Sequence, residues 1–378
     1  MPDNKPISII DHFSVIPDPR IERRKEHKLI DILTIAMCAV LCGADEFTEM
    51  EEFGAAKEEW FRTFLQLPNG IPSHDTFGRV FSLIDNRAFC ECFTSWVSAA
   101  TAELGVKLIA IDGKTSRRSH DKSRNKQAIH MVSAFATELG LTLGQVKTDE
   151  KSNEITAIPA LLSRLTLSGC IVTIDAMGCQ RQIAEKIVDK GGDYVLALKG
   201  NQGALHEDVR LFFDDSASGG FKDVRHDYYE TVEKGHGRIE TRRYWTVNDV
   251  GWLPEAKKWR GFKMIGMVES EREVGGSKTV ERRYYIGSLE NNARVFGSSV
   301  RNHWAIENKL HWSLDVTFRE DDSRIRIGEA AANMAVLRQM TVNILRQEKT
   351  LKRGMKTKRL KAGWDETYLV KLLGLLKI

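Results

Sequence analysis

The sequence lacks a cysteine pattern that would bind a metal or form a redox centre. It has six cysteines in 378 residues. None are spaced as C-x-x-C, which argues against a zinc ribbon or a thioredoxin-like motif. Several lie in apolar stretches and are predicted to be core residues. No signal peptide opens the chain, so we expect a cytoplasmic protein of a reducing compartment.

The chain also lacks a long apolar run. The longest, from Ile32 to Ala44, is closed by Asp31 and Asp45. It is too short to span a bilayer, so we expect no membrane partner. Internal repeats and low-complexity tracts are absent. The length suffices for two or three domains with full cores.

A strong net charge is absent too, since the formal value is only +4. Positive charge is instead concentrated in two segments. Residues 113–126 hold six basic side chains against one acid, Asp121, and residues 349–361 hold seven and no acid. Such clusters suit phosphate backbones, but a solvated surface or tail explains the second segment equally well.

Residues 1–105 are predicted to form a helical domain. The amphipathic segment 55–67 stops at the turn Pro68-Asn69-Gly70, and Ser73 is expected to cap the next helix. Helix, turn and capped helix resemble a DNA-binding helix-turn-helix, although plain helical bundles contain the same pattern.

From Val106 the pattern changes to strands and helices in the order βββαβαβα. This order predicts a mixed sheet with helices on both faces, which is the order of a ribonuclease-H-like core. A later segment contains two hairpins, around residues 235–237 and Gly275-Gly276. Two long helices are predicted after it, over residues 293–314 and 320–347. The fold class is therefore α/β, a ribonuclease-H-like mixed sheet with an all-β insertion and an N-terminal helical domain. The predicted parts after the helical domain are the core (106–215 and 291–348), the β-rich insertion (216–290) and a basic C-terminal segment (349–378).

Two aspartates share one local setting. Asp112 ends the apolar run 108–111, and Asp175 ends the apolar run 171–174. A charge at the end of a buried strand is costly unless it is paired or coordinated, and sites in α/β sheets gather at strand ends. Either aspartate alone is explained as a turn or cap residue. Two of them in one predicted sheet favour a functional site.

Glu307 supplies a third carboxylate. At about 100° per residue it falls at the centre of an apolar helical stripe that includes Val300 and Leu310. A lone buried glutamate costs several kcal/mol, which a core arginine or lysine or a shared divalent cation would relieve. Three carboxylates without a thiol favour Mg²⁺ or Mn²⁺. Two such ions, about 3.5–4 Å apart, can activate water and stabilise the leaving oxygen of a phosphodiester.

Polar and aromatic side chains in the segments that follow or surround these acids suit a polyanion, and we expect them to contact DNA. For Trp304 a core position is an alternative, and for His303 a buried hydrogen-bonded role. The residues are Lys114, Arg117, Arg118, Lys199, Asn201, Gln202, Arg301, His303 and Trp304.

Five long motifs carry a resemblance to a known family. They are "IAIDGKTSRRSHDKSR", "GQVKTDEKSNEITAIP", "TIDAMGCQ", "GGDYVLALKGNQ" and "RNHWAIENKLHWSLDVTF". The chain resembles, over nearly its whole length, the H-repeat-associated transposases of bacterial insertion sequences, which belong to the DDE superfamily. The resemblance implies a ribonuclease-H-like fold and two Mg²⁺ or Mn²⁺ ions on the triad Asp112, Asp175 and Glu307.

The resemblance further implies cleavage of transposon ends and strand transfer into target DNA. The implied partners are double-stranded DNA and further copies of the chain on paired ends. A metal-dependent nuclease on the same fold and an inactive DNA-binding remnant are the alternatives. Related transposases with a β insertion carry a Tyr, Arg, Glu, Lys signature around the third acid, from which this chain departs at Val300, His303 and Leu314.

Overall fold

The structure is a computed structural model that describes residues 9–102, 104–148, 154–235 and 237–374. The chain forms two compact units, which we describe separately. Unit 1 comprises Met1–Gly105, Gly113–Asn153 and Glu307–Ile378, and unit 2 comprises Val106–Asp112 and Glu154–Ile306. The domain boundaries given above stay a prediction.

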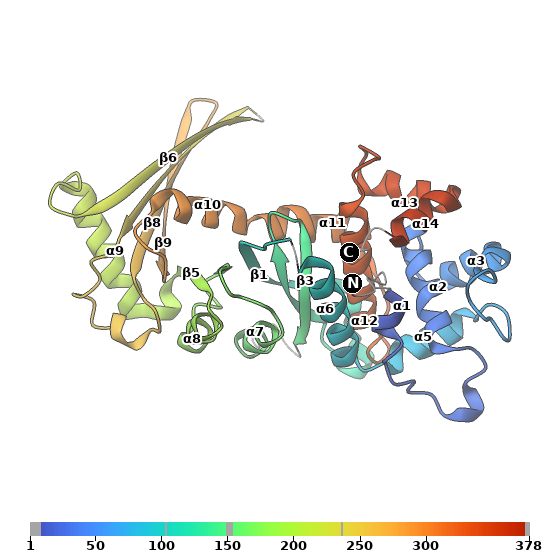
Figure 1. Ribbon diagram of the computed structural model, residues 1–378. Helices are drawn as coiled ribbons and strands as arrows, with labels where there is room; N and C mark the ends of the chain where they lie inside the picture. The colour runs from blue at the N-terminus through green and yellow to red at the C-terminus, as the bar shows by residue number, and fades with distance from the viewer. Residues whose placement is uncertain (1–8, 103, 149–153, 236, 375–378) are drawn as a thin grey trace, which may run out of the picture. The chain divides into compact units, whose positions relative to one another are not determined.

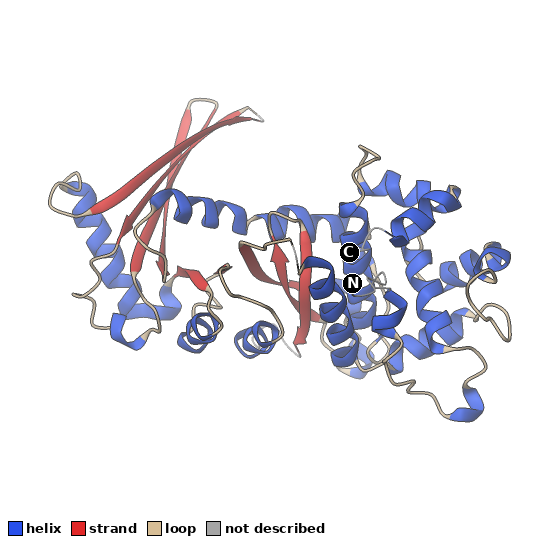
Figure 2. Ribbon diagram, viewed as in Figure 1, coloured by secondary structure: helices blue, strands red, loops and turns tan. Residues whose placement is uncertain are grey.

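Unit 1 is mainly helical (Figure 2). An antiparallel strand pair, β2 (His130–Ala136) and β3 (Leu141–Thr148), belongs to it as well. Short 3-10 turns are η1 (Glu22–Arg24), η2 (Arg117–Ser119), η3 (Lys122–Arg124) and η8 (Glu320–Asp322). Its helices are α1 (Ile9–Phe13), α2 (Leu29–Cys42), α3 (Phe47–Ala56), α4 (Glu58–Phe61), α5 (His74–Leu83), α6 (Asn86–Thr101), α11 (Trp312–Val316), α12 (Ala330–Gln347), α13 (Met355–Trp364) and α14 (Glu366–Gly374).

Helix α12 is the core of unit 1. Its residues 330–345 are all buried, and it contacts α2, α5, α6 and α13. Asn333 donates to two backbone carbonyls at the end of α5, over 2.8 and 2.9 Å. Asn343 accepts from the backbone N–H of Thr142 and donates to its carbonyl, both over 2.8 Å. These bonds offset the cost of burying the amides and fix α12 against α5 and β3.

Two helix predictions in unit 1 were wrong in extent. The segment 55–67 is not one helix, because it contains only the end of α3 and the short α4. The last long helix was predicted from Glu320, but α12 begins at Ala330 and residues 323–327 are not helical. The predicted cap at Ser73 is confirmed, since its Oγ accepts from the backbone N–H of Thr76 over 3.4 Å.

Unit 2 contains a mixed sheet with the strand order β1-β4-β5-β9-β8-β7-β6 (Figure 1). Strands β1, β4 and β5 are parallel, and β9 pairs with β5 in the antiparallel sense. The strands are β1 (Leu108–Thr115), β4 (Ile171–Ile174), β5 (Asp193–Leu198), β6 (His226–Gly235), β7 (Arg238–Val247), β8 (Met264–Val274) and β9 (Ser277–Gly287). The helices are α7 (Glu154–Ser163), α8 (Arg181–Asp189), α9 (Gly203–Ser218) and α10 (Ala293–His303), with the 3-10 turns η5 (Gly200–Gln202) and η6 (Ala256–Lys258).

The order βββαβαβα predicted from the sequence is confirmed by β1 to β3, α7, β4, α8, β5 and α9. Both predicted hairpins are present as β6–β7 and β8–β9. At the second hairpin, Gly275 and Gly276 have φ of 56° and 82°, which a two-residue turn of this kind requires. The β-rich segment is not a separate sheet, because β9 extends the central sheet from β5.

The predicted helix over 293–314 is broken in the structure. Helix α10 ends at His303, a π-helical turn covers Ile306–His311, and α11 follows. Within the described chain, no helix combines the length and apolar character needed to cross a bilayer.

Candidate carboxylate site and basic surfaces

Asp112 and Asp175 lie on neighbouring parallel strands at the same level. Strands β1 and β4 pair with Ile111 opposite Ile174, so the next residue on each chain is one of the two aspartates. Neighbouring strands are about 4.8 Å apart, so the backbones of the two aspartates lie side by side in unit 2. Both residues are half-buried.

The turn after β4 aims the carboxylate of Asp175. Its Oδ1 accepts from the backbone N–H groups of Met177 and Gly178, over 3.0 and 3.3 Å. A Cβ on Gly178 would lie 2.2 Å from a side-chain carbon of Ile174, so the turn needs glycine there. Burial raises the pKa of Asp175, and the nearby charge of Glu154 raises it further. A bound cation would relieve both effects.

Glu154 is a buried acid that the sequence analysis missed. It begins α7, where an acidic residue is explained by the helix dipole, so nothing in the pattern distinguished it. Glu154 affects the pKa of Asp175 only because the fold of unit 2 brings the end of β4 close to the start of α7.

Glu307 is exposed, and the prediction that it lies in the middle of a buried stripe is wrong. The π-helical turn that contains it widens the helix, so positions no longer advance by 100° per residue. Such turns occur frequently at functional sites. Glu307 belongs to unit 1, whereas the aspartates belong to unit 2, so the convergence of all three acids stays a prediction. Within the described residues, no cluster of three or more His, Cys, Asp or Glu side chains is arranged to hold a metal.

His303 and Trp304 are bound within unit 2. The Nδ1 atom of His303 lies 3.0 Å from the hydroxyl of Thr173 on β4. Burial lowers the pKa of His303 to about 4, so its imidazole is neutral at pH 7. The guanidinium of Arg283 lies 5.1 Å from the centre of the Trp304 ring. His303 thus ties α10 to the strand that ends at Asp175.

Lys114, which is predicted to contact DNA, takes part in ion pairs within unit 1. Its Nζ lies 2.6 Å from Asp315, 3.1 Å from Asp321 and 3.5 Å from Glu320. Its side chain is only 9% exposed. Burial lowers the pKa of Lys114, but the three acids outweigh this effect and the net shift is upward.

Arg117 and Arg118 remain available to a phosphate. Arg117 pairs with Asp321 over 3.2 Å and Arg118 with Asp322 over 3.5 Å, with side chains 82% and 52% exposed. Exposed pairs of this kind contribute little stability, so a phosphate can replace the carboxylate.

Of the three predicted DNA contacts that follow β5, one is exposed and two bind backbone carbonyls. Lys199 is exposed. The amide of Asn201 donates to the carbonyl of Ala176, and that of Gln202 donates to the carbonyl of Cys179 over 2.8 Å. Both amides therefore hold the loop that follows Asp175.

Arg301 and the C-terminal basic segment have partners as well. Arg301 pairs with Glu233 over 3.0 Å but remains exposed. In α13, the buried Lys358 donates to the carbonyl of Leu345 over 2.9 Å, and the buried Arg359 pairs with Asp45 over 2.9 Å. Part of the segment 349–361 is therefore internal structure. Neither of the two interpretations from the sequence, a solvated tail or a phosphate site, describes the whole segment.

Unit 2 is of the mixed α/β class, and it sets Asp112, which lies within β1, beside Asp175, which directly follows β4. The expectation that Asp112 ends its strand is wrong, because β1 continues to Thr115. The family described as "Transposase DDE domain" matches residues 105–344. The family described as "DDE_Tnp_1-associated" matches residues 10–97. The chain belongs to the DDE transposase family.

Curated relatives agree with this assignment. A candidate transposase of Escherichia coli O157:H7, YncI, is 45% identical over 97% of this chain and 94% of its own length. The H repeat-associated candidate transposase YhhI of Escherichia coli K12 is 44% identical over 97% of both chains. The solved piggyBac transposase synaptic complex with hairpin DNA gives a TM-score of 0.41 at 10% identity, over 97% of this chain and 78% of that chain. That score is too low to support an argument.

Proposed function

We propose that this protein cleaves the ends of its insertion sequence and joins the freed 3′-hydroxyl to target DNA. The observation that carries the proposal is the register of β1 and β4, which sets Asp112 beside Asp175. Glu307, exposed on its π-helical turn, is the proposed third acid. The family assignment supports the reaction class, and we take the catalytic core to be ribonuclease-H-like.

The donor set fits a hard divalent cation, since Asp112 and Asp175 are carboxylates on adjacent strands and no thiol lies in the proposed set. When bound, two Mg²⁺ or Mn²⁺ ions would supply charge that activates water and stabilises the leaving oxygen. The chain itself holds the Asp175 carboxylate through backbone N–H groups and holds the loop through Asn201 and Gln202. Positioning of this kind is the main protein contribution to phosphoryl transfer.

The proposed DNA contacts are the exposed basic side chains Arg117, Arg118, Lys199 and Arg301. We propose that the helical region before Val106 contributes further DNA contacts, and that several copies of the chain hold paired ends. Such binding weakens steeply with salt, because each neutralised phosphate releases counterions. We also propose a cytoplasmic location, because the protein would act on genomic DNA there and the reducing compartment would keep its six free cysteines reduced.

The test is cleavage of a labelled duplex that carries the element's end, with Mg²⁺, Mn²⁺ or no metal. Cleavage is expected only with a metal and is expected to fall at least about 100-fold in Asp175→Asn. Asp189→Asn is the matched control, because Asp189 is an exposed aspartate that ends α8 and pairs only weakly with Arg260, over 3.5 Å. Undiminished cleavage by Asp175→Asn would overturn the proposal. Joining of the cleaved strand to a second duplex separates a transposase from a nuclease.

A further inference from the structure

A groove in unit 1 has a basic wall that the proposed reaction does not use. Its volume is about 910 Å³, at the upper end of ligand pockets, which span roughly 300–1,000 Å³. It is lined by α5, by the start of α3, by η3 and by residues 324–327, which precede α12. We call residues 324–327 the strap.

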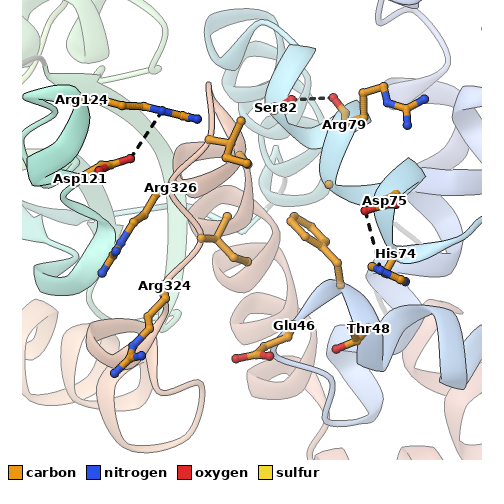
Figure 3. A pocket seen from close by; sticks show the side chains of 15 residues that line it. Glu46, Thr48, His74, Asp75, Arg79, Ser82, Asp121, Arg124, Arg324 and Arg326 are labelled. Carbon is orange, nitrogen blue, oxygen red and sulfur yellow. Dashed lines mark hydrogen bonds and ion pairs between the residues drawn. The ribbon is translucent and has the colours of Figure 1, made fainter.

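The basic wall consists of Arg124, Arg324 and Arg326, which lie on one side in Figure 3. Within the described chain, the guanidinium of Arg324 has no hydrogen-bond or ion-pair partner, and it is exposed. Arg124 has only a weak pair with Asp121, over 3.8 Å, and its side chain is 65% exposed. Two arginine heads on this wall are thus available to an anion.

The strap, which carries Arg324 and Arg326 of this wall, is fixed in place. Lys126 donates to the carbonyls of Arg326 and Gly328, both over 2.6 Å. The Nε of Arg326 donates to the carbonyl of Arg118 over 3.0 Å. Gly328 has φ of 51°, and a Cβ there would lie 2.3 Å from the carbonyl oxygen of Ser82 on α5. A wall held this firmly loses little entropy when it binds a ligand.

The other parts of the groove differ in chemistry. Phe47, Ile325 and Ile327 add apolar surface, and Ile327 is 61% exposed. Glu46 and Asp75 lie opposite the arginines in Figure 3. Arg79 and His74 also lie on this second side, and Asp121 lies beside Arg124. The groove therefore offers a mainly cationic side, apolar surface, and a second side that carries carboxylates together with Arg79.

We propose that this groove binds a short segment of single-stranded DNA. A single strand has phosphates on one side and unpaired bases on the other, which matches a mainly cationic wall that faces apolar and mixed polar side chains. Arginines bind phosphates, apolar side chains cover base rings, and carboxylates accept from the amino groups of bases such as cytosine. A duplex presents phosphates to both walls, and Glu46 and Asp75, which Arg79 offsets only in part, would repel one of its strands. The inference rests on the proposed function in taking DNA as the partner.

The first experiment measures binding of a fluorescent cytidine oligomer, about ten deoxynucleotides long, to the full chain by anisotropy. Arg324→Glu and Arg124→Glu are each expected to weaken binding about tenfold, because a phosphate contact is lost and a repulsion is added. Arg225→Glu is the matched control, since Arg225 is exposed, lies in unit 2 and does not line the groove. It changes the net charge equally and is expected to leave binding within about twofold.

The second experiment separates base contacts from phosphate contacts. An abasic oligomer of the same length and a matching duplex are each expected to bind about tenfold more weakly than the cytidine oligomer. Asp75→Asn is expected to reduce the preference for cytidine over thymidine oligomers. Equal binding of abasic and cytidine oligomers, or unchanged binding by Arg324→Glu, would overturn the inference.

The assay of transposon-end cleavage separates a failure of this inference from a failure of the proposed function. Wild-type cleavage together with unchanged oligomer binding by both arginine variants rejects the groove and leaves the transposase proposal standing. Undiminished cleavage by Asp175→Asn rejects the proposed catalytic site, whatever the oligomers do.

Discussion

Unit 1 contains two sets of basic side chains that look alike in the sequence and differ in their surroundings. Lys114, Lys358 and Arg359 are largely buried and bind carboxylates or backbone carbonyls. Arg124 and Arg324 are exposed on the wall of the groove with little or no pairing. The first set stabilises the fold, and the second set is available to a ligand. Local charge density therefore does not identify a phosphate site until the partners of each charge are known.

The largest expected effect is that of removing Lys114. Lys114→Met leaves Asp315, Glu320 and Asp321 without their shared cation, and removing one partner from a buried ion cluster costs about 3–5 kcal/mol. The free energy of unfolding in urea at pH 7 measures this loss. Arg117→Ala is the control, since Arg117 contacts the same Asp321 from an exposed position and is expected to cost under about 1 kcal/mol.

The same variant has a pH dependence with a definite sign. Burial raises the pKa of Glu320 in the folded protein, so its ionised form destabilises the fold as pH rises through that value. Loss of Lys114 increases this effect. The free energy of unfolding that Lys114→Met loses relative to the wild type should therefore become smaller as pH falls from 7 towards 4. A loss that grows over this range would contradict the ion-cluster interpretation.

The next effect concerns the attachment of the strap to α5. Gly328→Ala places a Cβ 2.3 Å from the Ser82 carbonyl in a left-handed backbone conformation, and we expect it to cost about 2–3 kcal/mol in urea unfolding. Gly251→Ala is the control, because its nearest atom would lie 4.0 Å away. Equal effects of the two substitutions would show that the strap is not held against α5 as described.

A third effect tests the neutral His303 in unit 2. Its pKa of about 4 in the folded protein lies below the ordinary value of 6.5, so the unfolded state binds the proton more readily. Stability due to this group is present above pH 6.5 and is lost as pH falls towards 4. Between pH 7 and 4.5 the wild type should lose about 2 kcal/mol more than His303→Gln. Parallel losses in urea unfolding at the two pH values would contradict this.

The sequence predicted the elements of the sheet because strands and helices follow from local apolar patterns. It predicted Asp112 and Asp175 as site residues for the same reason, since each ends an apolar run, and the register of β1 and β4 sets their backbones side by side. The exposure of Glu307 was missed because a π-helical turn has no pattern that a 100° projection detects. Glu154 was missed because its relation to Asp175 exists only in the fold.

The roles of basic residues were the least predictable, since they depend on tertiary partners. Lys114 follows Asp112 closely and is part of a basic segment, yet its acids come from residues 315–321, about two hundred positions later. Arg359 likewise finds Asp45 near the other end of the chain. The groove was missed because the strap was predicted to be helical, which would have directed its arginines differently.

The smallest expected effect on stability completes the comparison of the two basic sets. Arg324→Ala removes an exposed side chain whose guanidinium has no partner within the described chain, and it should change the free energy of unfolding by less than about 0.5 kcal/mol. Arg359→Ala removes a buried guanidinium that binds Asp45 and three carbonyls, and it should cost several times more in the same urea titration. Oligomer binding should reverse this ranking, since the Arg324 head is unpaired on the groove wall and Arg359 lies outside the groove. Equal rankings in the two measurements would mean that the free arginines are also structural, and the distinction between the two sets would fail.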